Sequence, residues 1–209
     1  MTWVPTFTGK RLDPLDPQPE QICIADIAHA LSNICRYAGH TRRFYSVAEH
    51  CIRLSLVTPS RFAKLGLLHD AAEAYILDQT APIKRLAEMK PYRDIDDAIT
   101  AVILAKYSVK PVTIAELSDF DHWDKGMVKA EVNAGLVPHP DNLPLLKEFT
   151  CPAALSRATV ISAHYEGSEW GWSPKYAEHR YLDRAKSLAI TDEGFLRRND
   201  AKMGPARVE

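Results

Sequence analysis

The strongest constraint on the fold is a helical pattern of apolar residues that polar side chains interrupt. Apolar residues recur every three to four positions along most of the chain, the period of amphipathic α-helices. The interrupted stripes run through Val47, His50, Cys51 and Leu54, through Phe62, Leu65, His69, Ala72 and Ile76, and through Leu117, Phe120, Asp124 and Met127 or Val128. Burying histidine or aspartate costs free energy unless something compensates the polar group. We therefore expect helices that bring these groups to a shared partner.

Capping residues, prolines and glycines indicate where the helices begin and end. Ser46 to Glu49 and Thr113 to Glu116 have the spacing of capping boxes. Asp26 is placed to cap the first helix, and Gly39 to end it. The expected helices run from Asp26 to about Gly39, from Ser46 to just before Pro59, from Ser60 to about Leu77, from about Tyr92 to Tyr107, from Thr113 to near Gly135, and from Tyr176 to Leu188. We predict an all-α protein, with strand-like alternation only around residues 6–12.

The chain has 209 residues, a length typical of one domain. Residues 1–25 are rich in proline and are predicted to be an irregular segment that packs on the core. Residues 26–137 are predicted to form the helical core. Prolines and glycines break residues 138–209, for which we predict a loop-rich extension with helical patches, such as 152–164, and a final helix.

Charge and composition exclude several classes of protein. Lys and Arg number 26 against 27 Asp and Glu, a balance that argues against broad nucleic-acid binding, so no nucleic-acid duplex is expected as a partner. The longest apolar run, Ala101 to Ala105, is far too short to span a membrane, and the amino terminus lacks a signal-peptide layout. The four cysteines form no C-x-x-C pair, which fits a reducing compartment. We expect a cytoplasmic protein that forms a homo-oligomer and binds no membrane.

A divalent cation explains the polar interruptions most economically. Imidazole nitrogen and carboxylate oxygen are ligands for Zn, Mn, Co or Fe, and His50, His69, Asp70 and Asp124 offer both. The absence of a nearby cysteine disfavours a purely structural zinc. Taken alone, either histidine is better explained as a core residue bonded to the backbone. The adjacent His69 and Asp70, together with partners on other helices, favour the metal site.

The last ligand has to be chosen among three neighbouring aspartates, and Glu49, next to His50, also needs an interpretation. Asp119 and Asp121 are rivals of Asp124 as the last ligand. Asp124 is preferred because it lies on the apolar stripe and stands seven residues before Glu131. Glu49 is explained by the capping box rather than by the site.

The motifs around these residues resemble a known family. The segments SVAEH (46–50) and LLHDAAEAYILD (67–78), with the later Asp124, resemble the HD-domain phosphohydrolases. Residues 25–50, ADIAHALSNICRYAGHTRRFYSVAEH, are similar to a compact bacterial and phage branch that includes deoxynucleoside 5′-monophosphatases and a viral dATP triphosphohydrolase. The resemblance covers roughly residues 5–135. It implies a single-domain HD-type helical bundle, with His50, His69, Asp70 and Asp124 as metal ligands.

The same resemblance implies roles for residues around the metal. Glu73 and Asp78 match the spacing of the two catalytic acids of the monophosphatase branch, although Leu77 replaces the small residue usual before the second acid. The substrate-binding residues that it implies are Arg36 and Lys84 for phosphate, Tyr37 near the base, and His40. Only His122 lies between residues 70 and 124, whereas dinuclear members have extra histidines there, so one divalent ion (Zn, Mn, Co, Fe or Mg) is expected.

This site predicts hydrolysis of a phosphoester in a small-molecule nucleotide or deoxynucleotide, either a 5′-monophosphate or a triphosphate, by metal-activated water. Glu73 would orient or deprotonate the water, and Asp78 would protonate the leaving oxygen. One alternative is a phosphodiesterase acting on cyclic or linear nucleotides, and another is a catalytically silent module that binds nucleotide. Without the resemblance, the better explanation of Glu73 and Asp78 would be that they are acidic residues of a solvated helix end. Trp170 and Trp172 have two interpretations. One is stacking on a base, and the other, which is commoner for such a loop, is packing over a helix.

Overall fold

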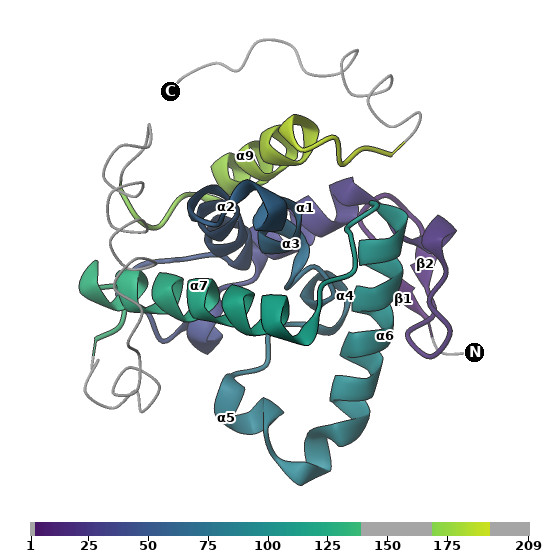
Figure 1. Ribbon diagram of the computed structural model, residues 1–209, viewed down its shortest axis with the longest axis horizontal. Helices are drawn as coiled ribbons and strands as arrows, with labels where there is room; N and C mark the ends of the chain where they lie inside the picture. The colour runs from purple at the N-terminus through teal and green to yellow at the C-terminus, as the bar shows by residue number, and fades with distance from the viewer. Residues whose placement is uncertain (1–2, 139–168, 193–209) are drawn as a thin grey trace.

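The computed structural model describes residues 3–138 and 169–192, which are mostly helical (Figure 1). The helices are α1 (Ile24–Asn33), α2 (Val47–Val57), α3 (Ala63–Leu68), α4 (Glu73–Ile76), α5 (Ala81–Lys84), α6 (Lys90–Lys106), α7 (Ile114–Asn133) and α9 (Pro174–Ser187). Short 3₁₀ turns cover Pro19–Gln21, Arg36–Gly39, Ser60–Phe62 and Ala87–Met89. The prediction of a mainly α-helical chain is confirmed. None of the described helices combines the length and the apolar character needed to cross a bilayer.

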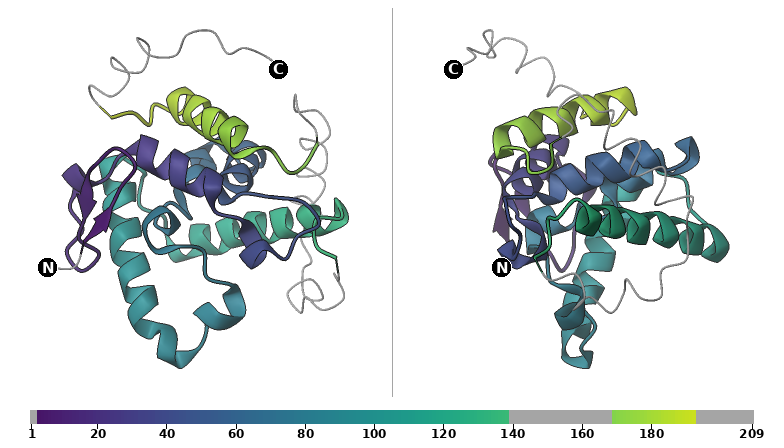
Figure 2. Two further views of the ribbon diagram at one scale, coloured as in Figure 1. Left: turned by 180° about the vertical axis from the view of Figure 1, so that it is seen from behind. Right: turned by 90° about the vertical axis from the view of Figure 1, so that its left-hand side faces the viewer.

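The helices stack in layers around α1 and α2. Helix α9 packs on one side of α1 and α2, and α7 lies against α2 on the other side (Figures 1 and 2). The larger core cluster lies between α1, α2, α3, α6 and α9, and includes Ile27, Leu31, Ile52, Leu68 and Ile103. A smaller cluster joins α2 and α3 to α7. Its buried members include Leu54, Phe62, Phe120 and Met127. The polar interruptions of the three stripes therefore meet where α2, α3 and α7 converge.

Helix α9 contributes buried residues to the larger core cluster. Ala177, Tyr181 and Ala185 are buried in the larger cluster, and the Tyr181 hydroxyl donates a hydrogen bond to the Leu67 carbonyl at 2.7 Å. Ser173 caps the helix by accepting from the Tyr176 N–H, which places its start two residues before the predicted Tyr176. The helical patches predicted at 152–164 lie outside the described residues.

The amino-terminal segment is more ordered than predicted. Strands β1 (Val4–Pro5) and β2 (Arg11–Leu12) form an antiparallel hairpin in which Val4 faces Leu12. The prediction that Asp26 caps the first helix is wrong. The helix starts at Ile24, and the Asp26 carboxylate accepts hydrogen bonds from the Thr8 N–H and hydroxyl at 2.6 and 2.9 Å. Asp26 therefore ties the hairpin to α1.

The first predicted helix also ends earlier than expected. Helix α1 stops at Asn33, and Arg36–Gly39 forms a separate turn in which Tyr37 and Ala38 have φ of 56° and 51°. An isolated antiparallel bridge between Cys35 and Ser46 brings this turn to the start of α2. Long-range pairing therefore overrides the helical pattern after residue 33.

The third predicted helix, Ser60 to about Leu77, is broken into three pieces. After α3 the backbone tightens into i to i−3 hydrogen bonds from the Ala71, Glu73, Ala74 and Tyr75 N–H groups, and α4 then begins at Glu73. His69 and Asp70 lie in this tightened turn, not inside a continuous α-helix. The tighter turn changes the angle between successive side chains, so both adjacent residues can face α2 and α7.

Helix α7 follows its prediction at the start but not along the whole stripe. Both halves of the Thr113–Glu116 capping box are formed. Phe120 and Met127 are buried, but Leu117, predicted on the inward face, is 53% exposed. The first turns of α7 extend beyond the helices that cover the rest of it.

Candidate metal centre

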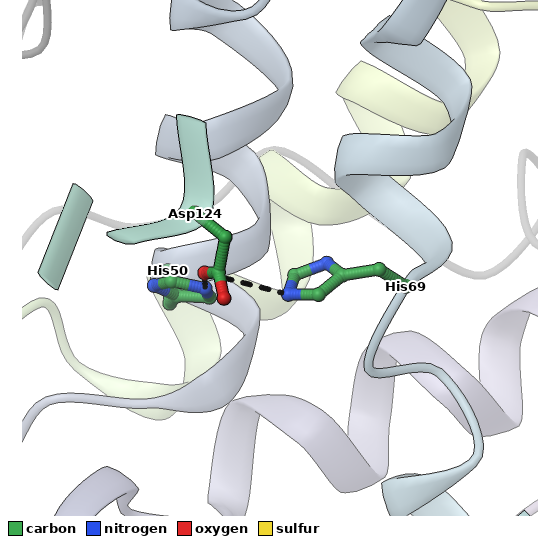
Figure 3. A group of neighbouring side chains, drawn as sticks. All are labelled: His50, His69 and Asp124. Atoms are coloured by element: carbon green, nitrogen blue, oxygen red, sulfur yellow. Dashed lines mark ion pairs between the residues drawn. The ribbon is translucent and has the colours of Figure 1, made fainter. Parts of the chain in front are cut away.

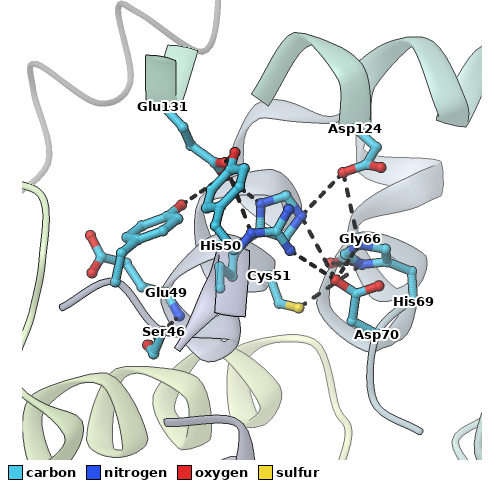
Figure 4. Close-up of polar contacts among 12 residues, drawn as sticks. Ser46, Glu49, His50, Cys51, Gly66, His69, Asp70, Asp124 and Glu131 are labelled. Carbon is cyan, nitrogen blue, oxygen red and sulfur yellow. Dashed lines mark hydrogen bonds and ion pairs between the residues drawn. The ribbon is translucent and has the colours of Figure 1, made fainter. Parts of the chain in front are cut away.

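Four predicted ligands converge from three parts of the fold. His50 comes from α2, His69 from the turn between α3 and α4, and Asp124 from α7 (Figure 3). Asp70, which follows His69 in the same turn, lies beside them (Figure 4). The His50 Nε2 atom lies 3.1 Å from Asp124 Oδ1 and 4.0 Å from Asp70 Oδ2. The His69 Nε2 atom lies 3.1 Å from Asp70 Oδ2 and 3.9 Å from Asp124 Oδ1.

These distances suit ligands of a single ion. Ligand atoms about 2.1 Å from one metal lie roughly 3.0 to 4.2 Å from each other in tetrahedral or octahedral geometry. The four measured separations, 3.1 to 4.0 Å, fall in that range. His50, His69 and Asp124 form a group that could hold a metal ion.

Hydrogen bonds on the far side of each ring prepare the near side for a cation. His50 Nδ1 contacts Glu131 Oε1 at 2.6 Å, and His69 Nδ1 contacts the Gly66 carbonyl at 3.1 Å. Both partners are acceptors, so Nδ1 carries the proton and Nε2 of a neutral ring presents a lone pair. The buried His50 Nε2 and Asp124 Oδ1 make no hydrogen bond although they are 3.1 Å apart. In the neutral ring two acceptors face each other, so a positive charge must lie between them, either a proton on Nε2 or a metal ion, and the donor set fits a divalent ion.

The charges around the site also favour a positive centre between His50 and Asp124. Burial and Arg36 act to lower the pKa of His50, but Glu131 and Asp124 prevail and raise it. Burial acts to raise the pKa of Asp124, but the close contact with His50, 3.1 Å away, prevails and lowers it. The site thus favours ionised carboxylates beside a cationic centre.

Glu131 is a site residue that sequence analysis missed in this role. It is fully buried on α7, and it lies against His50 among the polar contacts of Figure 4. Its carboxylate also accepts from the Tyr45 hydroxyl at 2.9 Å and from the Tyr37 hydroxyl. Burial opposes its ionisation, but Arg36 and His50 hold the pKa of Glu131 below its ordinary value. The seven-residue spacing from Asp124 was a signal, because it puts both residues on one face of α7.

A cysteine does lie beside the site, contrary to the sequence prediction. Cys51 Sγ is 4.0 Å from His69 Nδ1, and Cys51, His69 and Asp70 form a second group with metal-ligating atoms. The Gly66 carbonyl already bonds that ring nitrogen. Burial raises the pKa of the Cys51 thiol to about 11, so the thiolate that binds metals is scarce near neutral pH. The four-residue set of nitrogen and oxygen ligands fits an ion better.

The two predicted catalytic acids lie close to the ligands. Glu73 begins α4, is 5% exposed, and its Oε2 makes no hydrogen bond with the described residues. Burial, and then the charges of Asp70 and Asp78, raise the pKa of Glu73 well above its ordinary value. Burial also raises the pKa of Asp78, although Arg36 opposes it. Adjacent carboxyls with raised pKa values are typical of sites that transfer protons.

Of the predicted substrate contacts, Arg36 and Tyr37 join the cluster. Arg36 Nη1 donates to Asp70 Oδ2 at 3.2 Å, and Arg36 Nε lies 3.9 Å from Glu131 Oε2. Tyr37 reaches the same Glu131 oxygen through its hydroxyl, so that hydroxyl is engaged within the protein. Arg36 is thus the cation nearest to the ligand set.

Lys84 and His40 lie further out. Lys84, at the end of α5, pairs with Asp96 at 2.5 Å. Burial acts to lower the pKa of Lys84, but Asp96 prevails and raises it, with smaller contributions from Glu73 and Asp70. The His40 side chain is exposed and forms no hydrogen bond or ion pair within residues 3–138 and 169–192. The structure therefore does not bring His40 into the cluster.

Of the four predicted ligands, Asp124 borders a hollow on the side of α7. This hollow of about 470 Å³ ends at Asp124, whose side chain is 33% exposed. Its lining residues are Ile114, Leu117, Ser118, Phe120, Asp121 and Asp124. The two rivals of Asp124 point away to cationic partners, Asp119 to Arg61 at 3.5 Å and Asp121 to Lys125 at 2.5 Å. The choice of Asp124 among the three aspartates thus agrees with the geometry.

Glu49 does not close the predicted capping box. Ser46 accepts from the Glu49 N–H, but the Glu49 carboxylate accepts instead from Arg53 Nε at 2.9 Å and from the Gly171 and Trp172 N–H groups at 3.2 and 2.8 Å. The Arg53 guanidinium lies over the Trp170 and Trp172 rings, 4.1 and 4.7 Å from their centroids. The tryptophans therefore pack over α2, the commoner of the two alternatives.

Comparison with known proteins adds relatives but no activity. No family model matches the chain. The chain is 46% identical over 112 residues to the uncharacterized protein YfdR of Escherichia coli (strain K12), and 36% identical over 124 residues to the uncharacterized protein RCAP_rcc00048 of Rhodobacter capsulatus. These matches cover 54% and 55% of this chain, and 62% and 63% of the relatives. The match thus spans less than two thirds of either relative.

Proposed function

We propose that the chain is a metal-dependent phosphohydrolase of the HD type that cleaves a phosphoester of a nucleotide or deoxynucleotide, either a 5′-monophosphate or a triphosphate. The observation that carries this proposal is the pair of buried polar atoms, His50 Nε2 and Asp124 Oδ1, that face each other at 3.1 Å without a hydrogen bond. His69 and Asp70 complete a set of nitrogen and oxygen ligands around the same point. A purely structural metal would use the same ligands but would have no need of Glu73 and Asp78 beside them.

The residues beside the ligands suit phosphoryl chemistry. A divalent ion held by the four ligands would polarise a phosphoryl oxygen and lower the pKa of water. Glu73 orients the attacking water and takes its proton, because its buried carboxyl has a pKa raised well above the usual range. Asp78, near the surface of the same cluster, gives a proton to the leaving oxygen.

Cationic side chains account for the preference for phosphate. Arg36 lies within hydrogen-bond distance of Asp70 and has a buried Nε without a hydrogen-bond partner among the described residues. Its planar guanidinium suits the oxygens of a phosphoryl group, whose charge must be stabilised during transfer. Lys84 adds a positive charge near Glu73 and Asp70. The homo-oligomeric state and the cytoplasmic location stay predictions.

The decisive experiment measures hydrolysis of a panel of nucleoside mono-, di- and triphosphates with Mn, Co, Zn and Mg, with phosphate, pyrophosphate and triphosphate release recorded separately. Cyclic dinucleotides and cyclic monophosphates are included because they test the phosphodiesterase alternative. We expect release from 5′-monophosphates or triphosphates. Inactivity of the metal-loaded protein on every compound would contradict the proposal and favour a nucleotide-binding module.

A paired variant tests the role of Glu73. Glu73→Gln keeps the size of the side chain but removes its proton-accepting carboxylate, so turnover should fall about 10²- to 10⁴-fold while metal content and helicity stay unchanged. Glu88→Gln, in the turn Ala87–Met89 on the exposed surface, is the matched control and should retain full turnover. Unchanged turnover of Glu73→Gln would remove this residue from the mechanism.

A further inference from the structure

Glu131 connects two halves of the site through its two carboxylate oxygens. Oε1 contacts His50 Nδ1 at 2.6 Å and accepts from the Tyr45 hydroxyl at 2.9 Å. Oε2 accepts from the Tyr37 hydroxyl and lies 3.9 Å from Arg36 Nε. One oxygen therefore supports a metal ligand, and the other supports the segment that carries the phosphate-binding arginine.

The segment held by Oε2 has an unusual backbone. Tyr37 and Ala38 are consecutive residues with positive φ, 56° and 51°, a region that residues other than glycine rarely occupy. Such a conformation persists only where surrounding contacts hold it. The buried hydrogen bond from Tyr37 to Glu131 is such a contact, and Arg36 immediately precedes this turn, with its guanidinium 5.6 Å from the Tyr37 ring centroid.

The Glu131 carboxylate is held in place by its burial and by its hydrogen-bond donors. It is completely buried, and its hydrogen-bond donors come from the turn Arg36–Gly39, from Tyr45 before α2, and from α2 itself. Each oxygen has its own set of partners, so a change at one oxygen leaves the contacts of the other in place. Packing on three sides by residues of the core leaves little room for an alternative rotamer.

We propose that Glu131 is a positioning residue that couples metal binding to phosphate binding: through Oε1 it orients His50 toward the ion, and through Oε2 and Tyr37 it holds the turn that presents Arg36. This inference rests on the proposed function. It assigns different consequences to the two tyrosines that bond the same carboxylate, because each tyrosine bonds a different oxygen.

The experiment compares Glu131→Gln, Tyr37→Phe and Tyr45→Phe with the unchanged full-length protein. Cobalt affinity is measured by titration of the metal-free protein, and the visible spectrum of the cobalt protein reports the ligand geometry. Affinity for inorganic phosphate is measured by calorimetry on the cobalt-loaded protein. Circular dichroism and the unfolding midpoint show whether each variant is folded.

We expect Glu131→Gln to weaken cobalt binding about 10- to 100-fold and to alter the cobalt spectrum, because the acceptor behind a ligating histidine is lost. Tyr37→Phe should weaken phosphate binding about three- to tenfold, the effect of one buried hydrogen bond, and leave cobalt affinity and spectrum unchanged. Tyr45→Phe should leave phosphate affinity unchanged. This pattern requires that each oxygen supports a different part of the site. A general loosening of the site would instead weaken both cobalt binding and phosphate binding in both tyrosine variants.

The proposal is overturned if Tyr37→Phe and Tyr45→Phe lose phosphate affinity equally, if folded Glu131→Gln binds cobalt as tightly as the unchanged protein, or if the unchanged cobalt protein binds no phosphate. Failure of the proposed function gives a different result. In that case the unchanged protein binds no divalent ion or hydrolyses no nucleotide, whatever the behaviour of the tyrosine variants.

Discussion

At the scale of single residues, the partner on one side of a histidine ring decides what the other side can bind. Glu131 and the Gly66 carbonyl accept from the Nδ1 atoms of His50 and His69, which leaves both Nε2 atoms as acceptors toward Asp70 and Asp124. A core histidine satisfied by the backbone would need only one such bond. The second nitrogen of His50 has no hydrogen-bond partner among the described residues, which is the property expected of a metal ligand rather than of a core residue.

Asp124 offers a direct test of the ligand set. Asp124→Asn keeps the shape of the side chain but removes its negative charge, so the purified protein should lose most of its bound divalent metal. The control is Asp121→Asn, on the same helix but exposed and paired with Lys125. Metal content is measured by elemental analysis after dialysis against trace metal. Equal metal content in the two variants would exclude Asp124 as a ligand.

At the scale of elements, interruptions of helices place the chemistry. The tightened turn after α3 holds His69 and Asp70, and Leu77, at the end of α4, has φ of 70° and ψ of 158°. That backbone region is essentially restricted to glycine. The strained residue directly precedes Asp78, so the turn before the second predicted acid adopts a backbone that a leucine side chain disfavours.

Replacing Leu77 by glycine should stabilise the protein. Relief of about 1–3 kcal/mol of backbone strain outweighs the 0.5–1 kcal/mol or so of extra entropy that glycine has in the unfolded chain. The Leu77 side chain is 61% exposed and contributes little burial. We expect a gain of about 1 kcal/mol in the free energy of unfolding, measured with urea. Leu86→Gly is the control, since Leu86 has φ of −60° and should lose stability.

The segment that precedes α9 and packs against Arg43 and Phe44 leads to a second prediction at this scale. Gly171 has φ of 90°, and a Cβ atom there would lie 2.6 Å from Arg43 Cδ and 2.8 Å from the Phe44 carbonyl oxygen. Gly171→Ala should therefore lose about 2–4 kcal/mol of stability from strain and steric overlap.

Gly135→Ala separates these two causes. Gly135 also has positive φ, 74°, but a Cβ there meets nothing within 4 Å, so only the strain of about 1–3 kcal/mol applies. Chemical unfolding of both variants gives the comparison. A loss at position 171 no larger than that at 135 would contradict the close packing of this loop on the segment before α2.

At the scale of the whole molecule, stability depends on buried tyrosines distributed through the fold. The pKa values of Tyr75, Tyr107 and Tyr181 are raised, mainly by burial, and for Tyr107 also by the charge of Asp192. Tyr107 donates to Asp192 at 3.0 Å, while Asp192 accepts from the Ile24 N–H at 2.6 Å. These contacts join α6, α1 and the segment after α9 into one cooperative unit.

Alkaline pH should weaken that unit. A tyrosine whose pKa is raised by folding contributes its full stability below the pKa of the unfolded chain, about 10, and loses it as pH rises toward the folded value. We therefore expect the free energy of unfolding to fall above about pH 9.5. Each such hydroxyl contributes a slope of up to about 1.4 kcal/mol per pH unit. Urea unfolding from pH 7 to 11, followed by tyrosinate absorbance, measures this dependence.

Tyr75→Phe is the matched variant for the alkaline loss. It keeps the aromatic ring, which is 7% exposed, and removes one ionisable hydroxyl. The slope of the unfolding free energy against pH should become shallower by up to about 1.4 kcal/mol per pH unit, the contribution of one titrating hydroxyl. An unchanged slope would show that Tyr75 does not contribute to it.

The sequence by itself determined the features that depend on neighbours within a helical turn. The helical class, the complete capping box at Thr113 and the stripes that carry His50, His69 and Asp124 all follow from interactions between residues one to four positions apart. The same patterns also separated Asp124 from Asp119 and Asp121, because only one of the three lies on the buried stripe.

Only the tertiary structure decided which distant groups share a partner. His50 and Glu131 are 81 residues apart in the chain, and Glu49 bonds a loop more than 120 residues away, so no local pattern reports either contact. Helix α1 ends two residues before Cys35, which pairs with Ser46, and the backbone after Leu68 tightens into i to i−3 hydrogen bonds. The physical reason is that a buried polar group takes whatever partner removes its desolvation penalty, and helix packing, not sequence spacing, determines which partner is within reach.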